Sequence, residues 1–100
     1  MEKLKKIIIS DFVTESGKII KNLPLFYQVF GKPIGKAPLV LVNHALTGNS
    51  QVTDENGWWK DLIGKNKTID TTHFTALAFN IPGNGYDGLK ENLIHNYTHF

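Results

Sequence analysis

Two short apolar runs constrain the fold of this chain more than any other feature of its sequence. Residues 38–42 and 74–79 are mostly aliphatic or aromatic, and each run is followed at once by an asparagine, Asn43 and Asn80. Runs of this length are typical of strands buried on both faces, as in the middle of a parallel or mixed sheet. Residues 44–73 leave ample room for a crossover between parallel neighbours. We therefore predict a βαβ-like unit and, for the chain as a whole, an α/β fold.

The residues before the first run favour antiparallel strands. Residues 7–13 are rich in β-branched side chains, and residues 15–18 form a turn candidate in which Gly17 can take a positive φ. A returning strand begins at Ile19, and residues 25–30 are predicted as a further strand. The opening third of the chain is therefore predicted as an antiparallel meander that leads into a mostly parallel sheet.

Helices are scarce in a sequence whose buried strands need them on both faces of the sheet. Residues 58–63 are a candidate for one short helix that ends at Gly64, and residues 89–100 form a polar tail. The helices that would cover the sheet are missing from this pattern. We therefore expect residues 1–100 to be the N-terminal segment of a single, larger α/β domain whose C-terminal half is absent.

The composition excludes several classes of protein. The chain has no cysteine, which excludes a disulfide scaffold, a Cys-ligated zinc site and a thiol nucleophile. Its net charge of +2 is too small to indicate a nucleic-acid or membrane partner. The apolar stretch that starts at Ile7 is interrupted at Ser10, so no secretory signal is predicted, and no run reaches the ~20 residues of a membrane span. We expect a cytoplasmic protein.

The segment from Asn43 to Gly48 follows directly on the first apolar run, and ligand sites of open α/β sheets lie beyond the carboxyl ends of their strands. In hydrolases of this class, a sharp turn at this place aims a backbone N–H at the oxyanion of an acyl-transfer intermediate. Ala45 and Gly48 are small enough for a close approach of backbone to substrate. A plain turn with a structural His44 explains the same residues, and both interpretations stay open on this segment alone.

Four motifs, in order and at matching distances, resemble the homoserine O-acetyltransferase family. Together they are far more specific than any one of them. They are Asn43-His44-Ala45-Leu46-Thr47-Gly48-Asn49-Ser50, which resembles His-Ala-Leu-Thr-Gly-Asp-Ser of the family; Gly57-Trp58-Trp59; Lys67-Thr68-Ile69-Asp70-Thr71; and Phe79-Asn80 before a glycine-rich loop.

The resemblance implies an α/β-hydrolase fold with a helical lid, and a ping-pong transfer of acetyl from acetyl-CoA to the homoserine hydroxyl. A serine nucleophile, a histidine base and an aspartate carry this chemistry. Leu46 matches the residue whose backbone N–H forms half of the oxyanion hole, and Ala45, Thr47 and Gly48 belong to the same active-site loop. The resemblance also implies acetyl-CoA as a co-substrate, no cofactor, and a homodimer whose contact is made largely by lid helices. In the family, this acetyl transfer is a step of amino-acid (methionine) biosynthesis.

The catalytic triad is expected outside these residues. In the family the nucleophile lies in a Gly-x-Ser-x-Gly elbow that follows all four motifs, whereas Ser10, Ser16 and Ser50 lack the flanking glycines. The 100-residue segment alone is therefore expected to be inactive.

Two departures from the family pattern leave the acyl donor and the acceptor open. Asn49-Ser50-Gln51 stands where the family has Asp-Ser-His, and the loop from Gly83 to Gly88 stands where it commonly has Gly-Gly-Cys-Tyr-Gly. One alternative is an esterase or amidase that uses the same loop with water as acceptor. Another is a nucleotide-binding module, because Gly83, Gly85 and Gly88 spell Gly-x-Gly-x-x-Gly after a predicted strand.

Two further pairs of residues are interpreted as structural. Trp58 and Trp59 are adjacent, and we expect at least one of them to pack in the core. His95 and His99 have the i, i+4 spacing of a zinc-binding helix, but Asn96 replaces the glutamate of that motif and a third ligand is not evident. We predict an exposed polar segment there and no metal site.

Overall fold

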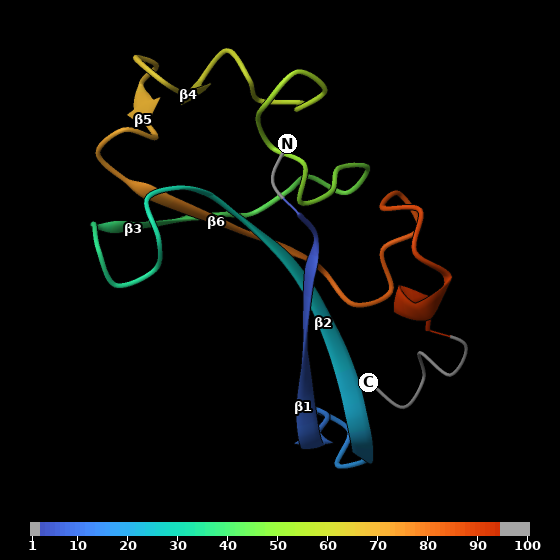
Figure 1. The fold of residues 1–100 in the computed structure, drawn as a ribbon. Coiled ribbons are helices and arrows are strands. Elements are labelled where there is room, and N and C mark those ends of the chain that lie inside the picture. The colour runs from blue at the N-terminus through green and yellow to red at the C-terminus, as the bar shows by residue number, and fades with distance from the viewer. Residues whose placement is uncertain (1–2, 95–100) are drawn as a thin grey trace.

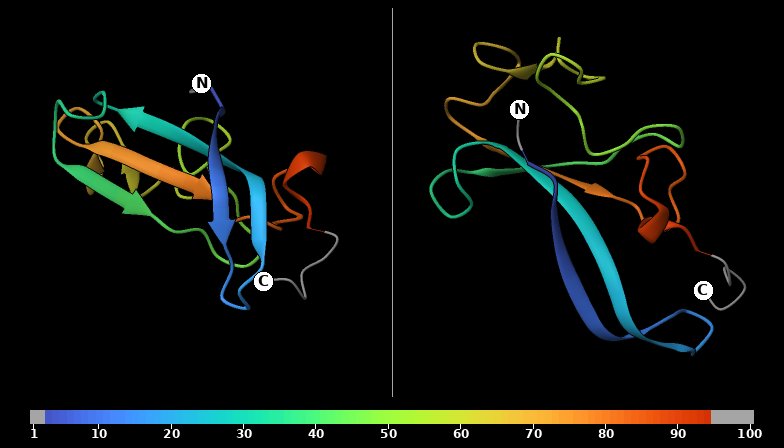
Figure 2. Two further views of the ribbon diagram at one scale, coloured as in Figure 1. Left: turned by 90° about the horizontal axis from the view of Figure 1, so that it is seen from below. Right: turned by 45° about the vertical axis from the view of Figure 1, so that its right-hand side comes forward.

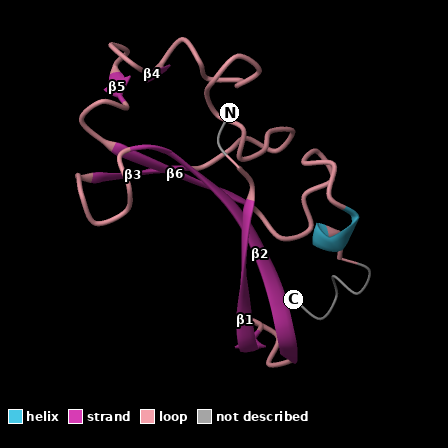
Figure 3. Cartoon of the chain, viewed as in Figure 1, coloured by secondary structure: helices cyan, strands magenta, loops and turns pink. Residues whose placement is uncertain are grey.

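A four-stranded mixed sheet organises the computed structural model, which describes residues 3–94 (Figure 1). The strands lie in the order β1-β2-β6-β3, and a separate two-stranded sheet pairs β4 with β5. Figure 3 shows that strands and loops make up nearly all of the described chain. The elements are β1 (Lys5–Val13), β2 (Ile19–Gly31), β3 (Leu39–Val42), β4 (Ile63–Gly64), β5 (Ile69–Asp70), β6 (Thr75–Asn80) and the 3-10 helix η1 (Lys90–Asn92).

The first two strands form a long antiparallel ribbon whose far end extends away from the rest of the sheet (Figure 2). The meander was predicted with two strands between Ile19 and Phe30, but β2 is one continuous strand of 13 residues. Pro24 pairs with Ile8 of β1 at a point where β6 has not yet joined, because pairing with β6 begins at Phe26. A proline is tolerated on such a free edge, so it does not interrupt the strand.

Strand β6 lies between β2 and β3 and pairs with them in opposite senses. Its pairing with β2 is antiparallel, and its pairing with β3 is parallel from Leu39 opposite Thr75 to Val42 opposite Ala78. The parallel pairing of the two apolar runs is therefore confirmed. Burial on both faces is only partly confirmed: Ala76, Ala78 and Asn80 of β6 are buried, while Leu77 and Phe79 on its other face are half-buried. β3 is more open, since its Leu39 and Leu41 are each 54% exposed. The reason is that β3 lies at the edge of the described sheet, and the described residues leave that face of it open.

The crossover from β3 to β6 contains no α-helix, so the predicted helix over residues 58–63 is wrong. The Trp59 carbonyl accepts the N–H groups of Leu62 and Ile63, each at 2.9 Å, which makes a single turn. The chain then enters β4, where Ile63 pairs with Ile69 of β5. Six residues between two glycines cannot recover the cost of nucleating a helix.

The core lies between the sheet and this crossover. Ala76 and Ala78 of β6 are small, so side chains of the crossover pack closely on them. The buried cluster consists of Phe30, Val42, Val52, Ile63, Ala76 and Ala78. Trp58 and Trp59 stack on each other with ring centroids 4.9 Å apart, but they stay 39% and 42% exposed, so the expectation that one of them is a core residue is wrong.

Asp70 organises the turn that leads from β5 into β6. Its Oδ1 accepts the N–H of Asn66 at 3.2 Å and both the N–H and the O–H of Thr72, at 2.9 and 2.7 Å. These hydrogen bonds, first of all that of the Thr72 hydroxyl, lower the pKa of the Asp70 carboxyl below its usual value. The aspartate of the third motif is therefore a local structural residue.

The exposed polar segment predicted around His95 and His99 cannot be compared with the structure, because both histidines lie outside the described residues. Among residues 3–94, no helix is long and apolar enough to cross a membrane.

Gly57, the glycine of the second motif, provides a test of the packing in the crossover. A Cβ at this position would lie 2.2 Å from the backbone of Thr53. We expect Gly57→Ala to lower the free energy of unfolding by about 3 kcal/mol, because a backbone contact cannot move aside as a side chain can. The matched control is Gly85→Ala, where a Cβ meets nothing within 4 Å. Urea unfolding of both variants measures the difference, and equal midpoints would contradict this packing.

Candidate active site

The loops that follow β3 and β6 lie together at one edge of the sheet, since parallel neighbours end at the same edge. In the first loop, the N–H of Gly48 donates to the Ala45 carbonyl at 2.9 Å, which closes a β-turn with Leu46 and Thr47 at its tip. Leu46 is 90% exposed. Among the described residues, its N–H donates to no acceptor. The turn therefore presents a backbone donor to the space beyond the sheet.

The turn leaves little room for a side chain at Gly48. A Cβ on Gly48 would lie 3.0 Å from the Cβ of His44 and 3.3 Å from the backbone nitrogen of Ala45. The sequence predicted a small residue here for the sake of the substrate. The short distance to His44 explains the small residue without a substrate, because the loop is tightly folded here.

His44 connects the first loop to the chain that follows β6. Its Nδ1 lies 2.6 Å from the Ala45 carbonyl, and its Nε2 lies 3.1 Å from the backbone nitrogen of Ile81. A carbonyl only accepts and an N–H only donates, so these partners fit a neutral imidazole that carries its proton on Nδ1. The structural role that the sequence left open for His44 is thus observed, and it fixes the start of the turn.

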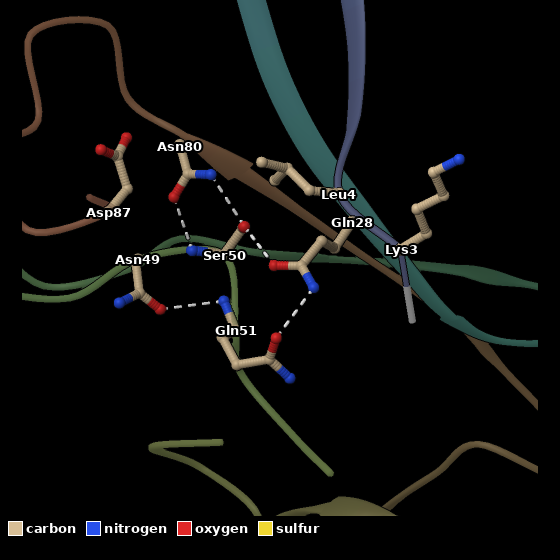
Figure 4. Close-up of a pocket in the computed structure, with 8 residues that line it drawn as sticks. All are labelled: Lys3, Leu4, Gln28, Asn49, Ser50, Gln51, Asn80 and Asp87. Atoms are coloured by element: carbon tan, nitrogen blue, oxygen red, sulfur yellow. Dashed lines mark hydrogen bonds between the residues drawn. The ribbon is translucent and has the colours of Figure 1, made fainter. Parts of the chain in front are cut away.

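Three buried polar side chains lie beneath the loops, as Figure 4 shows. The N–H of Ser50 donates to Asn80 Oδ1 at 2.7 Å, and Asn80 Nδ2 donates to Ser50 Oγ at 2.8 Å. The Ser50 hydroxyl in turn donates to Gln28 Oε1. All three residues are at most 5% exposed. The partners of the Ser50 hydroxyl are amides, which cannot act as the base that activates a nucleophilic serine.

Sequence analysis missed the roles of Gln28 and Asn80. A signal was present, because each is a polar residue placed within or at the end of an apolar strand, where a buried amide must find partners. The partners themselves come from the loop after β3, and no local pattern indicates that pairing.

An open pocket of about 490 Å³ lies beside these amides. It is lined by Lys3, Leu4, Gln28, Asn49, Ser50, Gln51, Asn80 and Asp87. The wall does not include the predicted loop residues Ala45, Leu46, Thr47 and Gly48. In this loop, the residues that line the pocket begin at Asn49. Within residues 3–94, no three His, Asp or Glu side chains gather as metal ligands.

The glycine-rich loop after β6 does not form the phosphate site that the nucleotide-binding alternative requires. Gly83 and Gly88 have positive φ angles of 90° and 73°, but the loop leads only into the three-residue η1. A dinucleotide site needs the N-terminus of a longer helix. The Asp87 carboxylate, which accepts the N–H of Leu89 at 2.9 Å and Asn92 Nδ2 at 2.6 Å, places negative charge in the same loop.

Several known proteins are similar to this chain in sequence and structure. A homoserine O-acetyltransferase from Natronomonas pharaonis is 35% identical over 96 residues, which cover 86% of this chain and 24% of that protein. The crystal structure of a homoserine O-acetyltransferase from Staphylococcus aureus has a TM-score of 0.70 and 36% identity over 83% of this chain and 25% of that one. The L374D mutant of esterase E22 has a TM-score of 0.76 and 29% identity over 94% and 27%. No family model matches the chain.

These similarities confirm the predicted resemblance to the homoserine O-acetyltransferase family and the predicted α/β-hydrolase fold. The chain spans less than a quarter of the length of the curated relatives it matches, for example 24% of the relative from Natronomonas pharaonis and 15% of one from Cryptococcus neoformans.

The buried amides predict a large effect of Asn80→Ala. This change leaves the buried N–H of Ser50 without its acceptor, so we expect the free energy of unfolding to fall by about 1–3 kcal/mol. Asn22→Ala removes the same side chain from an exposed position on β2 and is expected to cost less than about 0.5 kcal/mol. Thermal unfolding of the two variants compares them, and similar losses would show that the network contributes no special stability.

Proposed function

We propose that this chain supplies the oxyanion-hole loop of an acyltransferase that moves an acetyl group from acetyl-CoA to the hydroxyl of homoserine. The observation that carries the proposal is the turn from Ala45 to Gly48, which holds the N–H of Leu46 free at the carboxyl edge of the sheet. The family resemblance supports the choice of acetyl donor and homoserine acceptor.

The chemistry runs in two half-reactions. A histidine takes the serine proton as the serine oxygen attacks the thioester carbonyl, the carbonyl oxygen becomes an oxyanion, and collapse of the intermediate expels the CoA sulfur, which receives that proton. In the second half, the histidine takes the proton of the homoserine hydroxyl as that oxygen attacks the acyl-serine, and it returns the proton to the leaving serine oxygen. Leu46 N–H donates to the oxyanion in both halves, together with the N–H of the residue after the nucleophile.

The catalytic triad is assigned to a part of the enzyme that lies outside this chain. We propose that residues 1–100 form the N-terminal segment of one α/β-hydrolase domain, and that the serine, histidine and aspartate of the triad follow it. The substrates are small molecules, the location is the cytoplasm, and the whole enzyme is a homodimer.

A hydrolase is the second candidate. The similarity to esterase E22 favours it, because the same turn would serve an ester substrate with water as the acceptor.

Release of the CoA thiol by the whole polypeptide that contains this chain distinguishes the two. We expect release from acetyl-CoA that depends on homoserine, with O-acetylhomoserine detected by mass spectrometry. Release that does not depend on homoserine would identify a hydrolase. Absence of release with either acceptor would contradict the proposed function. Residues 1–100 alone serve as the control, and turnover by them would contradict the placement of the triad.

Leu46→Pro tests the role of the backbone donor. Proline removes the N–H, and its ring suits the second position of a β-turn, so the loop is expected to keep its shape. We expect kcat to fall about 10²–10³-fold, the usual cost of one oxyanion donor. Leu46→Ala keeps the N–H and removes only an exposed side chain, so its kcat is expected to stay within about twofold of the wild type. Equal kcat for the two variants would exclude Leu46 from the oxyanion hole.

A further inference from the structure

Two asparagines join the loops after β3 and β6 by reciprocal hydrogen bonds. Asn49 Nδ2 donates to the Tyr86 carbonyl at 3.1 Å, and Asn84 Nδ2 donates to the Gly48 carbonyl at 2.9 Å. Each amide nitrogen thus reaches from its own loop to the other loop. We call this pair of residues, Asn49 and Asn84, the asparagine clasp.

The amide oxygens of the clasp stay within their own loops. Asn49 Oδ1 accepts the N–H of Gln51 at 2.9 Å, and Asn84 Oδ1 accepts the N–H of Tyr86 at 3.0 Å. In both cases the acceptor bond spans two residues and shapes the local turn. The two functions of each side chain are therefore separable, because the oxygen shapes the loop and the nitrogen joins it to its neighbour.

The clasp depends on residues at which this chain departs from the family pattern. Asn49 stands at the aspartate of Asp-Ser-His, and an ionised aspartate accepts hydrogen bonds but donates none. Asn84 stands at the second glycine of the Gly-Gly-Cys-Tyr-Gly that is common in the family, and a glycine there has no side chain that could donate a hydrogen bond. Asn84 is only 8% exposed, so its amide is enclosed between the two loops. The two departures thus contribute to one structural feature.

The position of the clasp relative to Leu46 suggests what it does. Gly48 closes the turn through its N–H, and Asn84 holds the carbonyl of the same residue. His44 holds the other end of the turn against Ile81. The Leu46 N–H lies between these two attachments. Fixing a donor before the charge develops is the main source of oxyanion stabilisation.

We propose that Asn49 and Asn84 are positioning residues that hold the Leu46 N–H where the oxyanion forms. The inference rests on the proposed function. Because the clasp acts on the transition state and not on substrate affinity, its loss lowers kcat and leaves KM for acetyl-CoA unchanged.

The test uses Asn49→Asp and Asn84→Asp in the whole enzyme. Each variant keeps the Oδ1 acceptor and the size of the side chain; it replaces the donor nitrogen by a second acceptor and adds one negative charge. We expect kcat to fall about 5- to 30-fold in each variant, with KM for acetyl-CoA within about twofold of the wild type. Asn56→Asp makes the same chemical change at an exposed turn and is expected to leave both constants unchanged.

Two further readouts separate positioning from a general loss of stability. In a Leu46→Pro background, Asn84→Asp is expected to lower kcat no further, since the donor that it positions is gone. Amide hydrogen exchange of residues 44–48 is expected to rise in Asn84→Asp and to stay unchanged in Asn56→Asp. If Asn84→Asp does not fold, Asn49→Asp, whose bond lies at an exposed site, gives the same comparison.

The outcomes distinguish this inference from the proposed function. Wild-type kcat in both clasp variants, with a reduced kcat in Leu46→Pro, would overturn the clasp and leave the oxyanion loop in place. An equal loss from Asn84→Asp with and without Leu46→Pro would overturn it as well, because the effect would then not pass through Leu46. An enzyme without acyl-transfer activity would contradict the proposed function, and unchanged exchange of residues 44–48 would then contradict the clasp independently.

Discussion

The parallel pairing of β3 with β6 is the constraint on which the rest of this structure depends. Two strands that run side by side in the same direction end at the same edge of the sheet, so the loops that follow them become neighbours. The contacts at the candidate site lie within these loops, cross between them or lie beneath them. The small side chains of Ala76 and Ala78 let the crossover pack against β6, and this packing holds the strands in place.

Amide side chains, and not charges, join the elements at this edge. An amide offers a donor and an acceptor at once, so one residue can satisfy its own loop and the neighbouring one. Asn49 and Asn84 do this between the two loops, whereas Asn80 uses both its oxygen and its nitrogen to bind Ser50. The result is a polar framework beneath an exposed turn, with the Leu46 N–H left for a ligand. Such a framework suits a site where negative charge appears only during the reaction.

The sequence predicted the elements that depend on hydrophobic pattern. The two apolar runs indicated the parallel neighbours, and the motifs around His44 and Trp58 indicated the family. Features that depend on long-range contacts were not predictable. Residues 58–63 have helical spacing, but six residues form no stable helix without a tertiary partner. Two strands were predicted between Ile19 and Phe30, but β2 runs through Pro24, because Pro24 lies where β2 has only one neighbour.

The loop after β3 was predicted as the active-site segment, but the sequence could not show which atoms hold it. His44 was as compatible with a plain turn as with a site, and the roles of Gln28 and Asn84 depend on residues far away in the chain. The most direct test of the central claim is a crystal structure of the whole enzyme with a tetrahedral adduct on its nucleophile. We expect the Leu46 nitrogen to lie about 2.7–3.1 Å from the adduct oxygen. An adduct oxygen bound by other donors, out of hydrogen-bonding reach of Leu46, would contradict it.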